Sequence, residues 1–229
     1  MKTGIYWQDP EYRVKGIDFI FDPSLVLYLP LYRLDGASFV SKEAYGHFCT
    51  VSGALWRPDG RYLDGVDDKI DCGNDSSLGA SATELTTEVW INLSAIPTGG
   101  YHAMVQKGNQ YVFMVELSGA IARLKSLILK DDSTYQYLSD PVNSLEVGQW
   151  YHVVQWFLRP NHRIYVNGNL AVSATFDNNL NTAAATLWLG YYGSYFFNGL
   201  LGEVRIFNRA LTPLEILRNY LLRSGGIDK

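Results

Sequence analysis

The sequence lacks any long hydrophobic run, and it begins without the features of a secretory signal peptide. The longest early apolar run, residues 25–31, holds seven residues including Pro30, whereas a membrane-spanning helix needs about 20. The first residues, M-K-T-G-I-Y-W-Q-D-P-E-Y-R, contain neither an apolar stretch nor a cleavage site of small residues. We therefore expect a soluble chain without membrane insertion, either made without a signal peptide or given as a mature fragment.

Charged residues are also few, and neither positive nor negative charge strongly predominates. Lysine and arginine total 19, aspartate and glutamate total 23, and the formal net charge is −4. A protein that binds nucleic acid needs a basic stripe or patch to neutralise phosphates. Because the two signs are dispersed along the chain, we expect no nucleic-acid partner.

Cysteine is limited to Cys49 and Cys72. If the turn at residues 57–60 folds its flanking segments together, the two cysteines fall on neighbouring strands. A disulfide there would stabilise the fold by on the order of 3 kcal/mol in the chain-entropy model. Two buried thiols that pack as small apolar groups are at least as good an interpretation, so both alternatives stay open.

The chain is rich in β-forming sequence, with 47% hydrophobic and 14% aromatic residues. Asn167-Gly168 joins two β-rich runs, and this dipeptide predicts a type I′ hairpin because both central positions need a positive φ. In residues 151–158, both alternating faces are largely apolar. We therefore predict a strand inside a two-layer stack rather than at a wet edge.

Turn signals recur every eight to fifteen residues, which is typical of a β-sandwich or barrel. Residues 47–71 are predicted to form one hairpin around Pro58-Asp59-Gly60. No repeat or linker divides the chain, so we expect one domain over residues 25–229.

Residues 1–24 are aromatic but lack clean alternation. They are predicted to form either an extra edge strand or an arm that docks on another subunit or protein.

A helix is expected near the C-terminus. Thr212 and Glu215 have the spacing of a capping box, and Pro213 suits the first helical position. The predicted helix covers residues 213–222. Its expected apolar stripe consists of Leu214, Leu217, Leu221 and Ile216.

Three motifs resemble the LamG-like (laminin G, concanavalin A-type) jelly-roll family. They are W-x-H-V from Trp150, I-Y-V-N-G from Ile164, and F-N-G-L-L-G-E-V-R-I-F-N-R-A-L-T-P-L-E-I from Phe197. The resemblance covers roughly residues 25–222, and its C-terminal part is the most specific. It implies an all-β protein, an antiparallel two-sheet jelly-roll sandwich with one short C-terminal helix.

The same scaffold hosts lectins, adhesion domains, capsid accessories and some enzymes, so the resemblance constrains function less than fold. We expect a non-catalytic binding module that recognises a glycan or a surface protein. The alternative is a structural virion or surface-assembly protein in which residues 1–24 make subunit contacts, including contacts in a homo-oligomer. Because the family usually works outside cells, we expect an extracellular or virion-surface location without a recognisable signal peptide.

The sequence does not predict catalysis. Concanavalin A-type retaining hydrolases commonly carry paired carboxylates in an E-x-D-x-x-E-like pattern, and none of the eight glutamates here has an aspartate two residues on. Glu84 and Glu88 share a strand face but are spaced too far apart for a close pair. His152 is interpreted as a core histidine. The G-x-S-x-G and H-E-x-x-H motifs are missing.

Carbohydrate recognition uses aromatic faces with nearby amides and carboxylates. The richest candidate is the glycine turn at residues 188–197 with the asparagines upstream of it. The candidate sugar-binding residues are Tyr191, Tyr192, Tyr195 and Asn179. The weaker alternatives are Tyr101 with His102, and Tyr135 with Tyr137.

Acidic residues close to a glycine suggest a calcium site, because hard cations take six to eight oxygen ligands. The segment Y-L-D-G-V-D-D-K-I-D-C-G resembles calcium-proximal segments of LamG-like domains. The candidate metal ligands are Asp67, Asp68 and Glu203. No EF-hand spacing is present, and the same residues equally predict a solvated turn.

Overall fold

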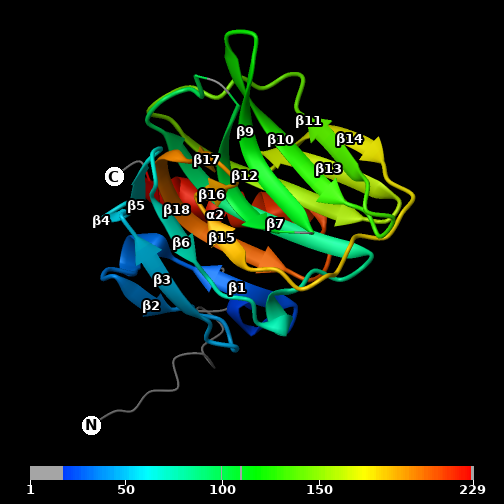
Figure 1. The fold of residues 1–229 in the computed structure, drawn as a ribbon, viewed down its shortest axis with the longest axis horizontal. Helices are drawn as coiled ribbons and strands as arrows, with labels where there is room; N and C mark the ends of the chain where they lie inside the picture. The colour runs from blue at the N-terminus through cyan, green and yellow to red at the C-terminus, as the bar shows by residue number, and fades with distance from the viewer. Residues whose placement is uncertain (1–17, 99, 109, 228–229) are drawn as a thin grey trace.

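The computed structural model describes residues 18–98, 100–108 and 110–227, and these form two antiparallel β-sheets packed face to face (Figure 1). The back sheet is ordered β14-β13-β12-β7-β18-β5-β4, with β1 also paired to β18. The front sheet is ordered β11-β10-β9-β8-β15-β6-β3-β2. The predicted two-sheet jelly-roll architecture is confirmed.

The elements have the following bounds. The back sheet consists of β1 Leu25–Leu29, β4 Leu55–Arg57, β5 Gly60–Asp64, β7 Glu84–Leu93, β12 Trp150–Leu158, β13 Asn161–Val166, β14 Asn169–Thr175 and β18 Asn198–Phe207. The front sheet consists of β2 Ser38–Val40, β3 Phe48–Ser52, β6 Lys69–Asp71, β8 Tyr101–Lys107, β9 Tyr111–Ser118, β10 Ile121–Leu129, β11 Tyr135–Ser139 and β15 Leu187–Leu189. A separate hairpin joins β16 Tyr191–Tyr192 to β17 Tyr195–Phe196, and the helical segments are η2 Asp18–Phe21, η3 Leu31–Arg33, η4 Ser76–Leu78 and α2 Pro213–Ile227.

The hairpin between β13 and β14 forms as predicted. Asn167 and Gly168 have φ values of 50° and 77°, which a type I′ turn requires. Strand β12 lies between β7 and β13 and is buried on both faces. Its Phe157 faces the core between the sheets, whereas Trp156 belongs to a second cluster on the outside of the back sheet. The outer face of β12 is thus buried because α2 covers it.

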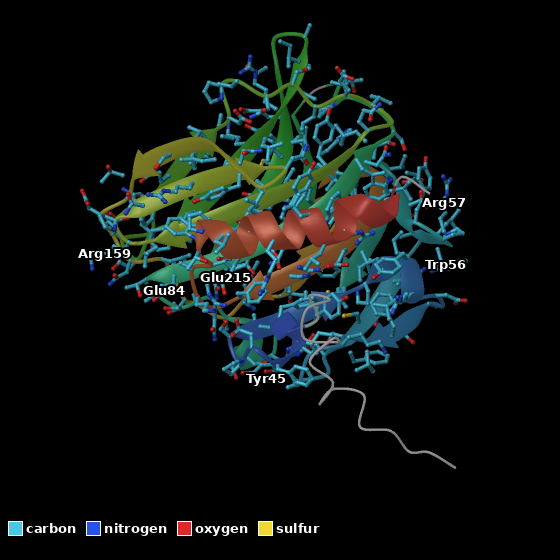
Figure 2. All side chains as sticks on the ribbon, turned by 180° about the vertical axis from the view of Figure 1, so that it is seen from behind. Tyr45, Trp56, Arg57, Glu84, Arg159 and Glu215 are labelled. Atoms are coloured by element: carbon cyan, nitrogen blue, oxygen red, sulfur yellow. The ribbon has the colours of Figure 1, made fainter. Side chains whose placement is uncertain are left out.

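Helix α2 crosses the outer face of the back sheet (Figure 2). The capping box forms, because the Glu215 backbone N–H donates to Thr212 Oγ1 (3.3 Å) and the Thr212 N–H donates to Glu215 Oε2 (2.7 Å). The helix extends to Ile227, five residues beyond the predicted end. Among the described residues, no helix is both long and apolar enough to span a membrane.

The predicted apolar stripe of α2 was partly wrong. Leu214 and Leu221 are 75% and 57% exposed, whereas Ile216 and Asn219 are buried. The side that meets the sheet carries a polar side chain because Glu88 of β7 lies beneath it and accepts hydrogen bonds from the Asn219 amide at 3.0 and 3.2 Å. A prediction from apolar residues alone could not identify the buried face of α2, because this face includes the polar Asn219.

Residues 47–71 do not form the single predicted hairpin. Strands β4 and β5 pair in the back sheet, whereas β3 and β6 pair in the front sheet. The chain crosses between the sheets at Gly53 (φ 76°) and Gly65 (φ 81°). Both positions need glycine, because an added Cβ would meet Asp68 beside Gly53 and Asn198 beside Gly65.

The β3–β6 register places Thr50 opposite Asp71, so the preceding Cys49 and the following Cys72 also face one another. Both are buried free thiols. Of the two alternatives for the cysteines, the structure therefore has the buried thiols. A hydrogen bond with Cys49, together with burial, raises the pKa of Cys72.

Most of the N-terminal segment predicted as an arm or edge strand, residues 1–17, lies outside the described residues. Its described end forms the short helix η2 rather than a strand. Phe19 packs into the outer cluster of the back sheet, with the Arg205 guanidinium 3.9 Å from its ring centroid. Strand β1 ends at Leu29, directly before Pro30.

Candidate functional site

Five tyrosines gather on the outer face of the front sheet. Cross-strand pairing places Val112, Leu127 and Tyr137 directly opposite one another on β9, β10 and β11. Val112 and Leu127 belong to an outer cluster with Met114, so Tyr137 lies on the outer face as well. The tyrosine face, as we call this surface, consists of Tyr101, Tyr135, Tyr137, Tyr192 and Tyr195.

The β16–β17 hairpin brings its two tyrosines to this surface. Tyr192 and Tyr195 are cross-strand partners. The Tyr195 ring meets the Tyr101 ring edge-on at 5.0 Å between centroids. Tyr195 also lies over Gly100, where an added Cβ would come within 2.2 Å of the tyrosine ring. This close approach fixes the hairpin against the sheet.

A charged pair lies among the rings. The Lys125 ammonium is 5.2 Å from the ring centroids of both Tyr101 and Tyr137, within the range of cation–π attraction. The same ammonium lies 2.7 Å from Glu116 Oε2. Burial alone would lower the pKa of Lys125, but Glu116 outweighs burial, so the pKa is raised and the side chain stays charged.

The tyrosine face is open above and apolar below. Tyr135 and Tyr137 are 46% and 54% exposed, and they lie 6.3 Å apart between ring centroids. Tyr192 packs on the buried cluster of Val112, Met114 and Leu127. Burial raises the pKa of Tyr192, and the hydroxyls of the other four tyrosines add to the shift. Its phenol therefore remains a hydrogen-bond donor near neutral pH.

Of the four predicted sugar-binding residues, the structure places Tyr192 and Tyr195 together on the tyrosine face. Tyr191 pairs with Phe196 instead, and its ring contacts Trp188 and the Lys69 ammonium. Tyr191 and Tyr192 are neighbours on a strand and therefore point to opposite sides of the hairpin.

Asn179 lies apart from the tyrosine face. Its side-chain oxygen accepts a hydrogen bond from Arg159 at 3.1 Å, and its backbone oxygen accepts one from Asp131. His102, predicted as a companion of Tyr101, points to the other side and lies 6.3 Å from the Phe197 ring. Burial lowers the pKa of His102 to about 4. Asn179 and His102 therefore contribute to the fold and are not part of the tyrosine face.

The candidate metal ligands are also divided. Asp67 and Asp68 come together with Asp64, so that one carboxylate oxygen from each lies within 4.8 Å of the others. Burial raises the pKa of Asp68, and the charges of Asp64 and Asp67 raise it further against the hydrogen bond from the Asp64 N–H. Glu203 is placed elsewhere, because it contacts Arg205 and Arg223 beneath α2.

A second group of charges is sealed between β7, β18 and α2. Glu88, Glu203, Arg205 and His152 are each no more than 6% exposed, and the gap among them is too small for a water molecule. Burial raises the pKa of Glu88 to about 7, while burial and nearby arginines lower that of His152 to about 3. The carboxylates of Glu88 and Glu203 therefore have no space beside them for a substrate.

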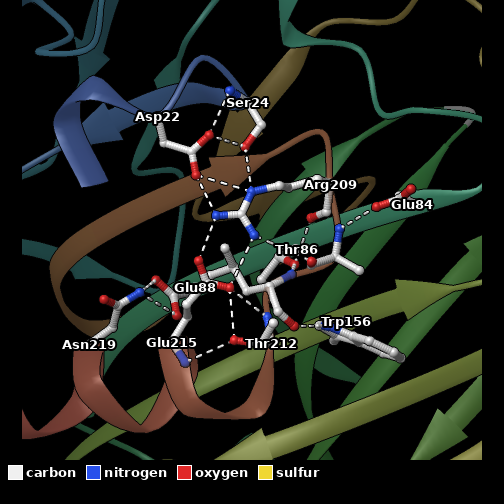
Figure 3. A network of polar contacts seen from close by, with 12 residues as sticks. Asp22, Ser24, Glu84, Thr86, Glu88, Trp156, Arg209, Thr212, Glu215 and Asn219 are labelled. Atoms are coloured by element: carbon white, nitrogen blue, oxygen red, sulfur yellow. Dashed lines mark hydrogen bonds and ion pairs between the residues drawn. The ribbon is translucent and has the colours of Figure 1, made fainter. Parts of the chain in front are cut away.

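Helix α2 contacts the back sheet through Asn219 and, one turn earlier, takes part in a separate polar network around Arg209 through Glu215 (Figure 3). Asn219 of α2 contacts Glu88, and Glu215 accepts from Arg209, which also contacts Asp22. Glu84, the other predicted acid on β7, accepts a hydrogen bond from the Ala210 backbone N–H. These contacts hold α2 and the segment around Asp22 against the back sheet, so these polar residues have a structural role.

Comparison with known proteins gives a family and a set of structural relatives. The family model described as the Concanavalin A-like lectin/glucanases superfamily matches residues 64–217. Among curated proteins, none matches the chain by sequence.

Solved structures show a similar fold. Domain 4 of AbnA, a GH43 extracellular arabinanase from Geobacillus stearothermophilus solved in complex with arabinotriose, is 18% identical with a TM-score of 0.65. The match covers 85% of this chain and 97% of that domain. The receptor binding domain of botulinum neurotoxin D is 17% identical with a TM-score of 0.68, over 88% of this chain and 53% of that one.

Another match is a structure of botulinum neurotoxin type C, whose cell entry depends on interaction with two ganglioside molecules. It is 14% identical, has a TM-score of 0.66, and is matched over 90% of this chain and 52% of that one. This chain thus spans about half the length of the toxin domains. At these identities the likeness concerns the fold.

Proposed function

Because this chain belongs to the Concanavalin A-like lectin/glucanases superfamily, we propose that it is a non-catalytic module that binds a glycan on the tyrosine face. The observation that carries this proposal is the gathering of five tyrosines, with Lys125 and Glu116 among them, on one open surface. Similar-fold proteins bind arabinotriose and gangliosides, which supports a sugar as the ligand class.

The chemistry of the face suits a sugar chain. Exposed tyrosine rings offer apolar faces for the C–H side of a pyranose or furanose, while their hydroxyls reach water and sugar hydroxyls. Glu116 accepts hydrogen bonds and Lys125 donates them. The surface is open rather than enclosed, so it suits a few residues of an oligosaccharide lying across β10 and β11.

The carboxylates support a role without catalysis. Hydrolysis of a glycosidic bond needs two carboxyl groups on either side of the substrate. Glu88 and Glu203 are buried under α2, and Glu116 on the tyrosine face is paired with Lys125. The proposed task is therefore recognition, at the outside of a cell or on a virus particle.

A glycan-array screen tests the proposal, with the wild-type chain beside Tyr137→Ala/Tyr192→Ala. The wild type is expected to bind a set of related glycans, and the double variant to lose that signal. Phe21→Ala is the control, because Phe21 is 71% exposed on η2, away from the front sheet. Wild-type binding that survives in the double variant would refute the tyrosine face as the site.

Calcium binding at Asp64, Asp67 and Asp68 remains a separate proposal. Three carboxylates supply part of the six to eight oxygens that calcium prefers. Burial raises the pKa of Asp68 most, and an ion would relieve the repulsion from Asp64 and Asp67 that raises it further. We expect calcium to raise the melting temperature of the wild type but not of Asp67→Asn. Equal melting temperatures in calcium and in a chelator would contradict this proposal without affecting the tyrosine face.

A further inference from the structure

A cavity of about 360 Å³ lies at the rim of the sandwich, where β3 begins and β6 ends, in the half of the front sheet far from β11. It opens between the segment that leads into β3 and the segment that follows β6. This volume is within the range of pockets that hold small molecules. Tyr45, at the rim of the molecule in Figure 2, is one of its walls. The lining residues used below are Tyr45, His47, Phe48, Asn74, Asp75 and Ser77.

Two aromatic rings of this cavity are open to solvent. Phe48 is 63% exposed and Tyr45 is 50% exposed. Exposed aromatic rings offer apolar faces on which the C–H side of a sugar can pack. The Tyr45 ring is stacked on the His47 ring at 5.7 Å and 15°, which holds it in place. The cavity therefore presents oriented rings against which an apolar ligand surface can pack.

The polar side of the cavity is also fixed in position, by hydrogen bonds to Asp75. Asp75 Oδ1 accepts hydrogen bonds from the Ser77 N–H (2.9 Å) and the Ser77 hydroxyl (2.7 Å). These bonds lower the pKa of Asp75. Its second carboxylate oxygen and the Asn74 amide make no hydrogen bond within the described part of the chain. Both groups are therefore free to bind a ligand.

The charges around the cavity indicate which ligand fits. Asp75 lines it, Glu43 lies 3.8 Å from His47 Nε2, and no lysine or arginine is among the lining residues. The nearby Lys107, whose charge also acts on Asp75, lies outside the lining and donates to the Ala185 carbonyl oxygen at 2.6 Å. An anionic sugar would be repelled here. We propose that the cavity binds one neutral pyranose ring, with Phe48 against its C–H face and with Asn74 and Asp75 bonding its hydroxyls.

This second site goes beyond the proposed function and does not rest on it. Phe48 shares the outer face of the front sheet with Thr50, two residues further along β3. Six strand spacings of about 4.8 Å separate β3 from β11, so Phe48 lies about 29 Å along the sheet from Tyr137. The two sites are therefore separable by mutation.

The test is an NMR titration that follows the ring C–H signal of His47, assigned with His47→Gln. The probes are the methyl glycosides of glucose, galactose, mannose and N-acetylglucosamine, with the methyl glycoside of sialic acid as the charged comparison. At least one neutral probe is expected to shift the signal saturably. Phe48→Ala and Asn74→Ala should weaken binding about tenfold or more, which corresponds to about 1.4 kcal/mol each.

Tyr137→Ala is the matched control, and it should leave the His47 titration unchanged. Phe48 and Asn74 are exposed, so their variants are expected to fold, and one-dimensional NMR spectra will verify this. Failure of all four neutral probes to move His47 would overturn the proposal. So would unchanged affinity in Phe48→Ala, or a sialoside that binds as tightly as the neutral sugars. None of these outcomes bears on the tyrosine face.

Discussion

Glu116 balances the charge of Lys125 in the middle of the tyrosine face. The two side chains are 2.7 Å apart and each is about one-seventh exposed, so the surface offers a sugar little net charge. In the proposed binding mode, this pair of charges determines which glycans the face accepts.

Glu116→Gln should therefore change glycan preference. Without the carboxylate, Lys125 keeps its charge uncompensated between Tyr101 and Tyr137, and anionic glycans are expected to gain several-fold in affinity over their neutral counterparts. Array binding of matched sialylated and neutral glycans measures this ratio. Lys125→Gln is the opposing variant and should shift the ratio the other way. An unchanged ratio in both variants would show that neither charge meets the ligand.

Among the structural elements, the β13–β14 turn and helix α2 depend on one another. An added Cβ on Gly168 would lie 2.8 Å from Leu217 Cδ1 and 3.2 Å from Leu217 Cα. The same Cβ on Gly148, which has a similar φ of 80°, would meet nothing within 4 Å. These two glycines therefore separate backbone strain from contact with the helix.

Gly148→Ala is expected to lower the free energy of unfolding by about 1–2 kcal/mol, the cost of a left-handed conformation. Gly168→Ala should lower it by about 1 kcal/mol or more beyond that, because the helix must also shift. Urea unfolding of both variants measures the difference. Equal losses would mean that α2 does not rest on the turn.

Elements set by local sequence were predictable. The Asn167-Gly168 turn and the Thr212–Glu215 cap each depend on a few neighbouring residues, and both formed as predicted. The pairing of β3 with β6 was not predictable, because the chain changes sheets at Gly53 and Gly65 and the β4–β5 hairpin between them joins the back sheet. Local signals do not say which sheet a strand joins.

The candidate sites show the same limit. Tyr192 and Tyr195 were found from their glycine turn, but their partners on β8 and β11 lie more than 50 residues away in the sequence. Glu203 was grouped with Asp67 and Asp68 from the family resemblance, but a bulge between Leu201 and Glu203 reverses the alternation of β18. The bulge turns Glu203 to the outer face, under α2, where no sequence signal pointed.

For the molecule as a whole, buried histidines should set the response to acid. Burial lowers the pKa of His102 to about 4 and those of His152 and His162 to about 3. Groups with lowered pKa values contribute stability above about pH 6.5 that is lost as the pH falls. Glu88 acts in the opposite sense, because its raised pKa of about 7 favours the folded state below about pH 4.5 and this contribution is lost as the pH rises.

Three histidines outweigh one glutamate, so the urea midpoint is expected to fall steadily from pH 6.5 to pH 4.5. Glu215, whose pKa is lowered to about 2 mainly by its hydrogen bond from Arg209, adds to the loss below about pH 4.5. Urea unfolding at half-unit intervals of pH measures the profile. A midpoint that is constant or rises toward pH 4.5 would contradict the burial of neutral histidines.

We propose that the front sheet binds a glycan and that the back sheet, covered by α2, does not. Oxidative footprinting with the glycan that binds most strongly on the array distinguishes the two surfaces. Bound glycan is expected to protect Tyr135, Tyr137 and Tyr192 and to leave Phe21, on the opposite side, unchanged. Protection around Phe21 and α2, with Tyr135 and Tyr137 still fully reactive, would contradict it.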